Sequence, residues 1–190
     1  MIFTLIKQIR PLDQQVRSGK WRANLQSNSV CIRGRVLGSV GLGNIAGELF
    51  RMVRGMGFGR LLSFDPYAPR ERALDLGVEL VDLETLLRES DFLTINAPLN
   101  AETRNLVGPR ELALMKPAAY LINTFRGPLV DEAALVDVLR NRLIAGAALN
   151  VFDKEPMPPT HPLCGLDNVI LTPHSVGWTE ELIHDLNFEV

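Results

Sequence analysis

Three side chains that could carry out acid–base chemistry follow apolar runs of this sequence. Arg126 follows the run 120–123, Glu155 lies beyond the run 144–151, and His174 follows the run 169–172. A catalytic base needs a pKa near neutrality, and a carboxylate beside an imidazole holds the ring and stabilises its charged form. An arginine fork binds a carboxylate through paired hydrogen bonds. These residue types favour proton transfer on a small substrate that carries a carboxylate.

Each of the three residues also has a purely structural interpretation. Arg126 could cap a helix or form a salt bridge, Glu155 could be a solvated loop acid, and His174 could be a turn histidine. Their joint position at predicted strand ends favours a site over three separate structural roles. His161 and His184 have no such support, and we expect them to be surface residues.

The stretch 35–67 predicts a nucleotide-binding unit. An apolar run ends at a glycine turn, a helical pattern follows, and a second apolar run ends at Asp65. Gly41 would permit the tight turn, Gly43 would let the backbone approach a pyrophosphate, and Ala46 would fit where helix meets strand. The helix N-terminus would hold the phosphates, while Asp65 would accept the ribose hydroxyls of NAD. A structural turn that binds no nucleotide remains the alternative.

The rest of the chain alternates short apolar runs with helical patterns. A helix opens the chain, and Pro11 should kink or interrupt it. The runs predict further strands at 78–81, 92–96, 120–123, 144–151 and 169–172, and helices at 69–76, 82–89, from 108, at 131–141 and from 179. This alternation predicts an α/β fold, a doubly wound parallel sheet of the Rossmann type. Ligands of such sheets bind at the carboxyl ends of the strands.

Composition and charge are those of a soluble globular protein. The chain has 190 residues, of which 46% are apolar and 22% charged, which is enough to bury the core of one domain. Six Lys and Arg residues in the segment 1–34 stand against the single acid Asp13, but they alternate with an apolar stripe at helical spacing. We therefore expect that the chain does not bind nucleic acid.

The remaining composition favours a cytoplasmic protein without a membrane anchor. No apolar run is long enough to cross a bilayer, and no signal peptide is evident. Cys31 and Cys164 lack partners at metal-ligand spacing, so we expect reduced thiols and no metal site.

Six segments of the sequence follow one another in the order found in a known family. They are VGLGNIAG, SFDPY, NAPLNAETRNLVG, LINTFRGPLVDEAAL, AGAALNVFDKEP and NVILTPHSVGWTEE, within residues 35–181. With these segments the sequence resembles the D-isomer-specific 2-hydroxyacid dehydrogenase family, which includes phosphoglycerate dehydrogenases and hydroxypyruvate reductases. The resemblance implies an oxidoreductase that transfers hydride between NAD(H) and a small 2-hydroxy or 2-oxo acid. It also implies a homodimer, because dimers of this family form through the cofactor domain.

The resemblance implies a role for each matching residue. Arg126 would bind the substrate carboxylate and carbonyl, Glu155 would pair with the histidine, and His174 would exchange the hydroxyl proton. The cofactor residues would be Gly41, Gly43, Asn44 and Ile45 at the phosphates, Asp65 at the ribose, Ala97, Pro98 and Thr103 on the adenosine side, and Thr124, Asn150 and Gly177 on the nicotinamide side. Asn150 stands where most of the family has aspartate, and its amide offers both a donor and an acceptor but no charge.

The resemblance also predicts how the chain is divided. We expect a crossover helix and connector at 1–28, an NAD-binding Rossmann domain at 29–177, and the start of a truncated C-terminal helix at 178–190. The substrate domain of the family is expected to be largely absent.

Three functions are compatible with this division. The first is a dehydrogenase whose activity in this chain is weak or depends on missing sequence. The second is a non-catalytic NAD(H)-binding or sensing module that acts through protein contacts. The third is a methyltransferase-like Rossmann protein, which would not predict the segments NTFRG, DKEP and TPH.

Overall fold

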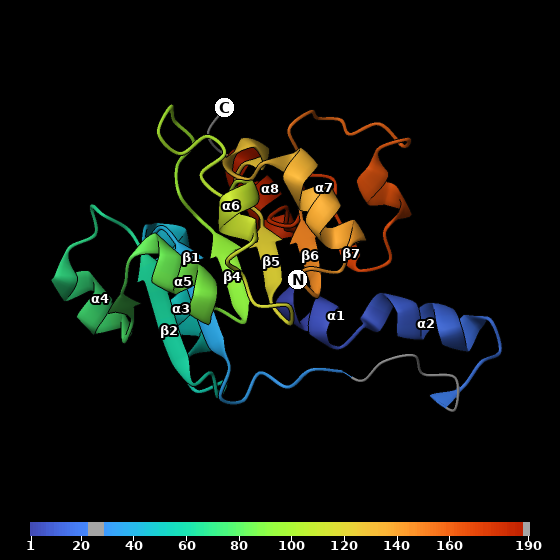
Figure 1. Cartoon of the computed structure of the whole chain (residues 1–190), viewed down its shortest axis with the longest axis horizontal. Helices are drawn as coiled ribbons and strands as arrows, with labels where there is room; N and C mark the ends of the chain where they lie inside the picture. The colour runs from blue at the N-terminus through green and yellow to red at the C-terminus, as the bar shows by residue number, and fades with distance from the viewer. Residues whose placement is uncertain (23–28, 188–190) are drawn as a thin grey trace.

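A parallel β-sheet forms the centre of the molecule. The computed structural model describes residues 1–22 and 29–187, and within them the sheet has seven strands in the order β3-β2-β1-β4-β5-β6-β7, all paired in parallel (Figure 1). The strands are β1 (Val36–Val40), β2 (Arg60–Phe64), β3 (Glu79–Leu80), β4 (Phe92–Ile95), β5 (Tyr120–Asn123), β6 (Gly146–Leu149) and β7 (Val169–Leu171). The predicted doubly wound α/β fold is confirmed.

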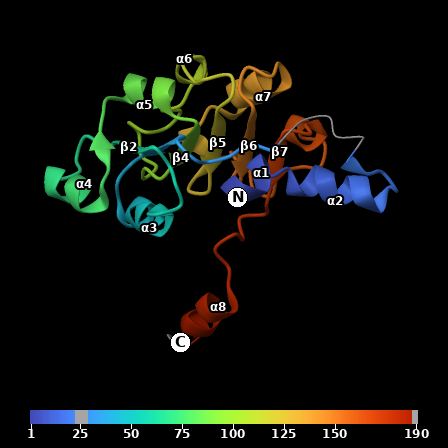
Figure 2. The same ribbon diagram turned by 90° about the horizontal axis from the view of Figure 1, so that it is seen from below.

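Helices cover both faces of this sheet. The helices of the described residues are α1 (Ile2–Ile6), α2 (Ile9–Arg17), α3 (Asn44–Val53), α4 (Arg70–Leu76), α5 (Leu83–Glu89), α6 (Pro109–Leu112), α7 (Glu132–Arg140) and α8 (Glu180–Asn187), with short 3-10 turns η2 (Gly127–Leu129) and η3 (Pro162–Gly165). Figure 2 shows α5, α6 and α7 on one face and α1 and α3 on the other. Each face has its own apolar cluster, one built on leucines of α5 and α7 and the other on residues of α1, α3 and α4.

Side-chain caps fix the start of two of the helices. Asp82 accepts a hydrogen bond from the amide of Thr85 at 2.8 Å at the start of α5, and Asp131 accepts one from Ala134 at 2.9 Å at the start of α7. Such caps satisfy amides that have no partner inside the helix. The predicted cap at Asp82 is confirmed.

The opening helix is interrupted, but before Pro11 rather than at it. The break lies at Lys7 and Gln8, where Gln8 takes a left-handed conformation with φ 51°. Pro11 instead lies in the first turn of α2, where an amide would have no intrahelical partner, so its missing N–H is tolerated. α1 belongs to the body of the fold, because Ile6 is fully buried and its carbonyl accepts a hydrogen bond from Val30.

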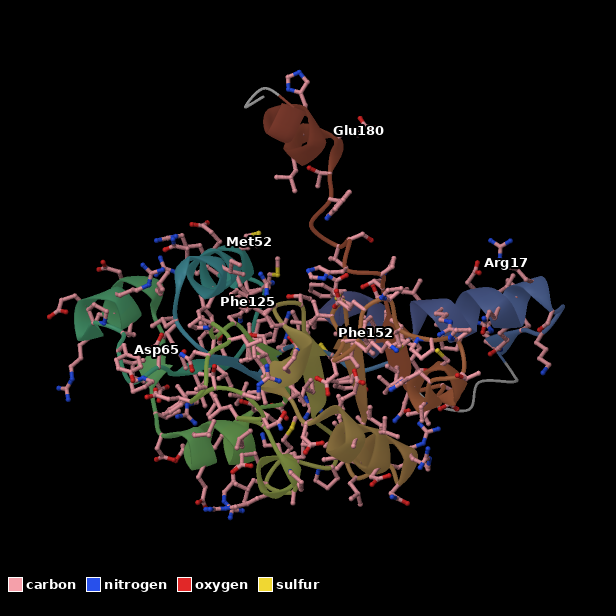
Figure 3. The ribbon with its side chains drawn as sticks, turned by 90° about the horizontal axis from the view of Figure 1, so that it is seen from above. Arg17, Met52, Asp65, Phe125, Phe152 and Glu180 are labelled. Atoms are coloured by element: carbon pink, nitrogen blue, oxygen red, sulfur yellow. The ribbon has the colours of Figure 1, made fainter. Side chains whose placement is uncertain are left out.

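Other boundaries differ from the sequence prediction by a few residues. β6 is shorter than the predicted run 144–151, and the connector predicted at 21–34 lies partly outside the described residues. α8 projects away from the body, as Figure 2 and Figure 3 show, and Trp178 just before it is 69% exposed. Within the described residues, no helix is long and apolar enough to cross a membrane.

Candidate functional site

The strand order reverses its direction at β1 and β4. β1 lies between β2 and β4, so the chain leaves β1 and β4 in opposite directions across the sheet. Ligands of doubly wound sheets bind where this reversal occurs. The predicted site residues come from segments that follow β1, β2, β4, β5, β6 and β7, and Asp65, Phe125 and Phe152 mark their spread across the molecule in Figure 3.

The glycine turn after β1 requires its first glycine. Gly41 has φ 95°, and a Cβ there would lie 2.9 Å from the backbone carbon of Asn96. Both the left-handed conformation and the close approach exclude other residues. The turn is thereby pressed against the end of β4.

The second glycine opens onto free space at the start of α3. No side chain caps this helix, and a Cβ on Gly43 would have no neighbour within 4 Å. Asn44 and Ile45, the first two residues of α3, are exposed. Free amides at a helix start, together with the positive end of the helix dipole, are suited to hold phosphate oxygens. This donor set therefore fits the pyrophosphate of a dinucleotide.

Asp65 is bonded to the same turn. Its Oδ2 accepts a hydrogen bond from the amide of Leu42 at 2.8 Å, and its Oδ1 accepts one from the amide of Tyr67 at 2.9 Å. Each carboxylate oxygen keeps a further lone pair, so the group can still accept ribose hydroxyls.

Arg72 is a residue near this turn that sequence reasoning missed. From α4 its guanidinium donates to the carbonyls of Leu42 at 2.7 Å and Gly43 at 2.9 Å. The only signal in the sequence was a cation in the first turns of the helix that follows Asp65.

The residues predicted for the adenosine side follow β4. Ala97 is buried and Pro98 is exposed. The hydroxyl of Thr103 donates a hydrogen bond to the carbonyl of Pro98 at 2.6 Å. This bond joins the two ends of the segment 98–103.

Glu155 and His174 form a direct pair. His174 Nδ1 lies 2.7 Å from Glu155 Oε2, and Glu155 Oε1 accepts a hydrogen bond from the amide of Phe152 at 2.9 Å. Burial alone would raise the pKa of Glu155, but the hydrogen bond to His174, the amide of Phe152 and the charge of Arg126 outweigh it. The net result is a lowered pKa for Glu155, which stays a carboxylate. Within the described residues, His174 Nε2 has no hydrogen-bond partner.

Arg126 lies in the turn that follows β5. Its Nη1 donates to the carbonyl of Phe125 at 2.6 Å, and its guanidinium carbon lies 5.4 Å from the centroid of the Phe125 ring. Asn123 holds this turn, since its Nδ2 donates to the carbonyl of Arg126 and its Oδ1 accepts from the amide of Phe125. Asn123 was predicted only as the end of a strand. The guanidinium is exposed, and its remaining N–H groups are available to a carboxylate.

Asn150 binds the segment around His174, and this corrects the expectation that its amide offers an acceptor to a ligand. Its Oδ1 accepts three hydrogen bonds, from Thr172 Oγ1 at 2.8 Å, the amide of Ser175 at 3.0 Å and the amide of Val176 at 3.3 Å. The two backbone donors fix the orientation of the amide group, so only Nδ2 is left, as a donor. Within the described residues Nδ2 donates no hydrogen bond.

The other two residues predicted for the nicotinamide side differ in exposure. Thr124 is half-buried beside the Arg126 turn. Gly177 is exposed, and a Cβ there would meet nothing within 4 Å.

The expectation for the two other histidines is wrong for His161. His184 is exposed, as expected. His161 is half-buried, and its Nε2 lies 3.2 Å from Oε1 of Glu132 at the start of α7. Both cysteines are free and exposed. Within the described residues, no cluster of three or more His, Cys, Asp or Glu side chains could hold a metal ion.

Comparison with known proteins shows the family of this chain. The family model described as "D-isomer specific 2-hydroxyacid dehydrogenase, NAD binding domain" matches residues 1–176. The chain belongs to this family. The D-2-hydroxyacid dehydrogenase family was the one predicted from the sequence segments, and NAD is the cofactor of the matched domain.

Relatives within the family are substantially longer than this chain. A glyoxylate reductase of Korarchaeum cryptofilum is 39% identical over 184 residues, which cover 95% of this chain and 55% of the relative. A D-3-phosphoglycerate dehydrogenase of Archaeoglobus fulgidus is 36% identical over 181 residues, which cover 95% of this chain and 34% of the relative. The apo structure of D-mandelate dehydrogenase from Rhodotorula graminis superposes with a TM-score of 0.89 at 32% identity, covering 99% of this chain and 56% of that one. The chain thus spans about half the length of most of these D-2-hydroxyacid dehydrogenases, and a third of the longest.

Proposed function

We propose that this protein is an NAD-dependent oxidoreductase that interconverts a small 2-hydroxy acid and the corresponding 2-oxo acid. The observation that carries the proposal is the 2.7 Å contact between Glu155 and His174, with the guanidinium of Arg126 close enough to lower the pKa of Glu155. A base, the carboxylate that holds it and a carboxylate-binding cation at one sheet edge suit this reaction. The activity named for glyoxylate reductase relatives supports the same reading.

In this proposal each residue has a separate task. Arg126 binds and orients the substrate carboxylate through its free N–H groups. His174 Nε2 gives a proton to the substrate oxygen during reduction and takes it back during oxidation. Glu155 holds the ring through Nδ1 and stabilises the imidazolium. When NAD(H) is bound, its nicotinamide supplies or accepts the hydride.

The proposed cofactor contacts lie along the same edge. We propose that residues 29–177 form the cofactor-binding unit, with residues 1–28 as crossover helix and connector and 178–190 as the start of a further helix. The amides of Asn44 and Ile45 would hold the pyrophosphate, and Asp65 the ribose. The contacts would be completed by Gly41, Gly43, Ala97, Pro98, Thr103, Thr124, Asn150 and Gly177.

We also propose a homodimer in the cytoplasm. Phe3, Ile9 and Val16 on α1 and α2 are each about half exposed, and such apolar surface favours self-association. The free, exposed thiols of Cys31 and Cys164 suit a reducing compartment. Light scattering of the purified chain tests the dimer, and a monomer at micromolar concentration would reject it.

Titration of the chain with NADH, followed by addition of glyoxylate, hydroxypyruvate or pyruvate, tests the function. We expect NADH to bind and its absorbance to fall when a 2-oxo acid is added. His174→Ala should abolish the fall and leave NADH binding intact, whereas His184→Ala should change neither. Binding without oxidation of NADH would reject catalysis by this chain alone and favour a non-catalytic NAD(H)-binding module, and absence of binding would reject both.

A further inference from the structure

A second pair of acid and histidine lies outside the proposed site. Glu132 is the first residue of α7, and His161 immediately precedes η3. Glu132 Oε1 and His161 Nε2 are 3.2 Å apart, and their side chains are only 16% and 20% exposed. A half-buried pair that the proposed chemistry does not use calls for another role.

The hydrogen bonds of His161 fix where its proton lies. Its Nδ1 accepts a hydrogen bond from the amide of Leu163 at 3.3 Å, so Nδ1 carries no proton. The proton of the neutral ring is therefore on Nε2, which faces Glu132. The two side chains are therefore in close polar contact, with the ring Nε2 and the carboxylate Oε1 3.2 Å apart.

Glu132 also binds the other end of the same loop. Its Oε2 accepts a hydrogen bond from the amide of Asp153 at 3.2 Å. One carboxylate thus binds residues 153 and 161, the two ends of the loop that contains Glu155. We call residues 153–161 the acid loop.

The first residue of the acid loop has a charged environment of its own. Burial raises the pKa of Asp153, the neighbouring Asp131 raises it further, and Arg104 acts against them.

The start of the acid loop is held by backbone contact as well. A Cβ on Gly127 would lie 2.1 Å from the backbone carbon of Phe152 and 2.7 Å from the nitrogen of Asp153. Gly127 directly follows Arg126, and the same connection leads through η2 to Glu132. The segment that carries Arg126 therefore contacts the segment that carries Glu155 at two points.

We propose that Glu132 and His161 are positioning residues, which hold the acid loop so that the Glu155 carboxylate meets His174. Neither residue touches the reacting atoms. The consequence for proton transfer rests on the proposed function, whereas the effect on the Glu155 to His174 contact does not.

The pKa of the Glu155 carboxyl group shows whether the acid loop stays in contact with His174. In ¹³C-labelled protein the Glu155 carboxyl signal, assigned with Glu155→Gln, gives its pKa directly. His161→Ala should raise the pKa of Glu155 toward the ordinary glutamate value, because the loop can then leave His174. His161→Gln, whose amide can still donate to Glu132, should restore most of the lowered pKa. His184→Ala removes an exposed histidine and should leave the pKa of Glu155 unchanged.

Trypsin cleavage after Lys154 gives a second readout. Lys154 lies inside the acid loop, so its cleavage depends on local opening. In His161→Ala, cleavage there should become about tenfold faster, as expected for loss of a close polar contact with a charged group. Cleavage after Arg17, outside the loop, should keep its rate.

A folded His161→Ala protein with unchanged Glu155 titration and unchanged Lys154 cleavage would overturn the proposal. If that variant does not fold, Glu132→Gln is the test, since it keeps the size of the side chain and removes its charge. Wild-type Glu155 titration and wild-type Lys154 cleavage in Glu132→Gln would also overturn the proposal. NADH titration of the unmodified chain is independent of these results. Failure to bind NADH would reject the proposed function and leave the acid loop result standing.

Discussion

The carboxylate of Asp65 accepts a hydrogen bond from the amide of Leu42, with Oδ2 2.8 Å from the nitrogen. The residue proposed to bind the cofactor ribose at the end of β2 is therefore also bonded to the middle of the glycine turn after β1. Changes at Asp65 should act on the ribose contact and on the phosphate turn together.

Two different replacements of Asp65 should separate the ribose contact from the contact with the phosphate turn. Asp65→Ala removes both, and we expect NADH affinity to fall by at least about tenfold, as for loss of a hydrogen bond to a charged group. Asp65→Asn keeps an acceptor for Leu42 but loses the charge that repels a 2′-phosphate, so NADPH affinity should rise relative to NADH. Fluorescence titration with both cofactors measures this, with the exposed Asp75→Asn as control. An unchanged preference in Asp65→Asn would contradict the ribose assignment.

Asn150→Asp should change which redox form of the cofactor binds more tightly. One carboxylate oxygen can accept the three hydrogen bonds that Asn150 Oδ1 now accepts, and the other would add a negative charge near the oxidised, positively charged nicotinamide. We expect the ratio of NAD⁺ to NADH affinity to rise by about tenfold. Titration with each form measures it, and an equal change in both affinities would show that Asn150 does not face the nicotinamide.

Gly127→Ala should strongly destabilise the protein. Its new methyl group would overlap the backbone of Phe152, which cannot rotate away as a side chain can. We expect the free energy of unfolding in urea to fall by about 3 kcal/mol, the upper end for overpacking. Gly165→Ala is the matched control, because a Cβ there meets nothing within 4 Å. Equal stability of the two variants would contradict the close approach.

The protein should lose stability in acid below about pH 4.5. The hydrogen bond to Arg60 lowers the pKa of Glu79, and the amide of Thr85 lowers the pKa of Asp82, while Glu155 is lowered by its partners against the effect of burial. A carboxyl group with a lowered pKa in the folded state stabilises the fold above its unfolded pKa. That contribution disappears as the pH falls through the folded pKa. Asp153, whose pKa is raised, acts in the opposite direction.

Thermal unfolding between pH 3 and pH 7 checks this expectation. The midpoint should be nearly constant near neutrality and should fall below pH 4.5, with a smaller fall in Glu79→Gln. A midpoint that rises on acidification would show that groups with raised pKa values dominate.

The sheet could be predicted from sequence because its strands are short apolar runs between strong turn residues. β5 matches the predicted run 120–123, and the Asp82 cap lies where a side-chain acceptor precedes a helical pattern. The break at Gln8 was missed because a left-handed glutamine has no sequence signal, whereas Pro11 has an obvious one. In the first turn of a helix that proline is harmless.

In the candidate site, only the residues that lie in sequence motifs could be predicted. Motif order pointed to Glu155 and His174, but the use of Asn150 Oδ1 by three donors depends on the path of the backbone after β7. The contact between Glu132 and His161 joins residues far apart in sequence, with no common motif. Such contacts follow from packing, which sequence spacing does not encode.

The burial of Ile6 has a consequence for the order of events during synthesis. Ile6 is fully buried in a cluster that also contains Ile122 of β5 and Ala148 of β6. Synthesis proceeds from the amino to the carboxyl end, so Ile6 is made well before Ala148. Until then α1 has no completed surface to pack against, so the nascent chain carries an exposed apolar helix that chaperones can bind. Docking of α1 in this domain therefore waits until the later-made strands β5 and β6 are in place.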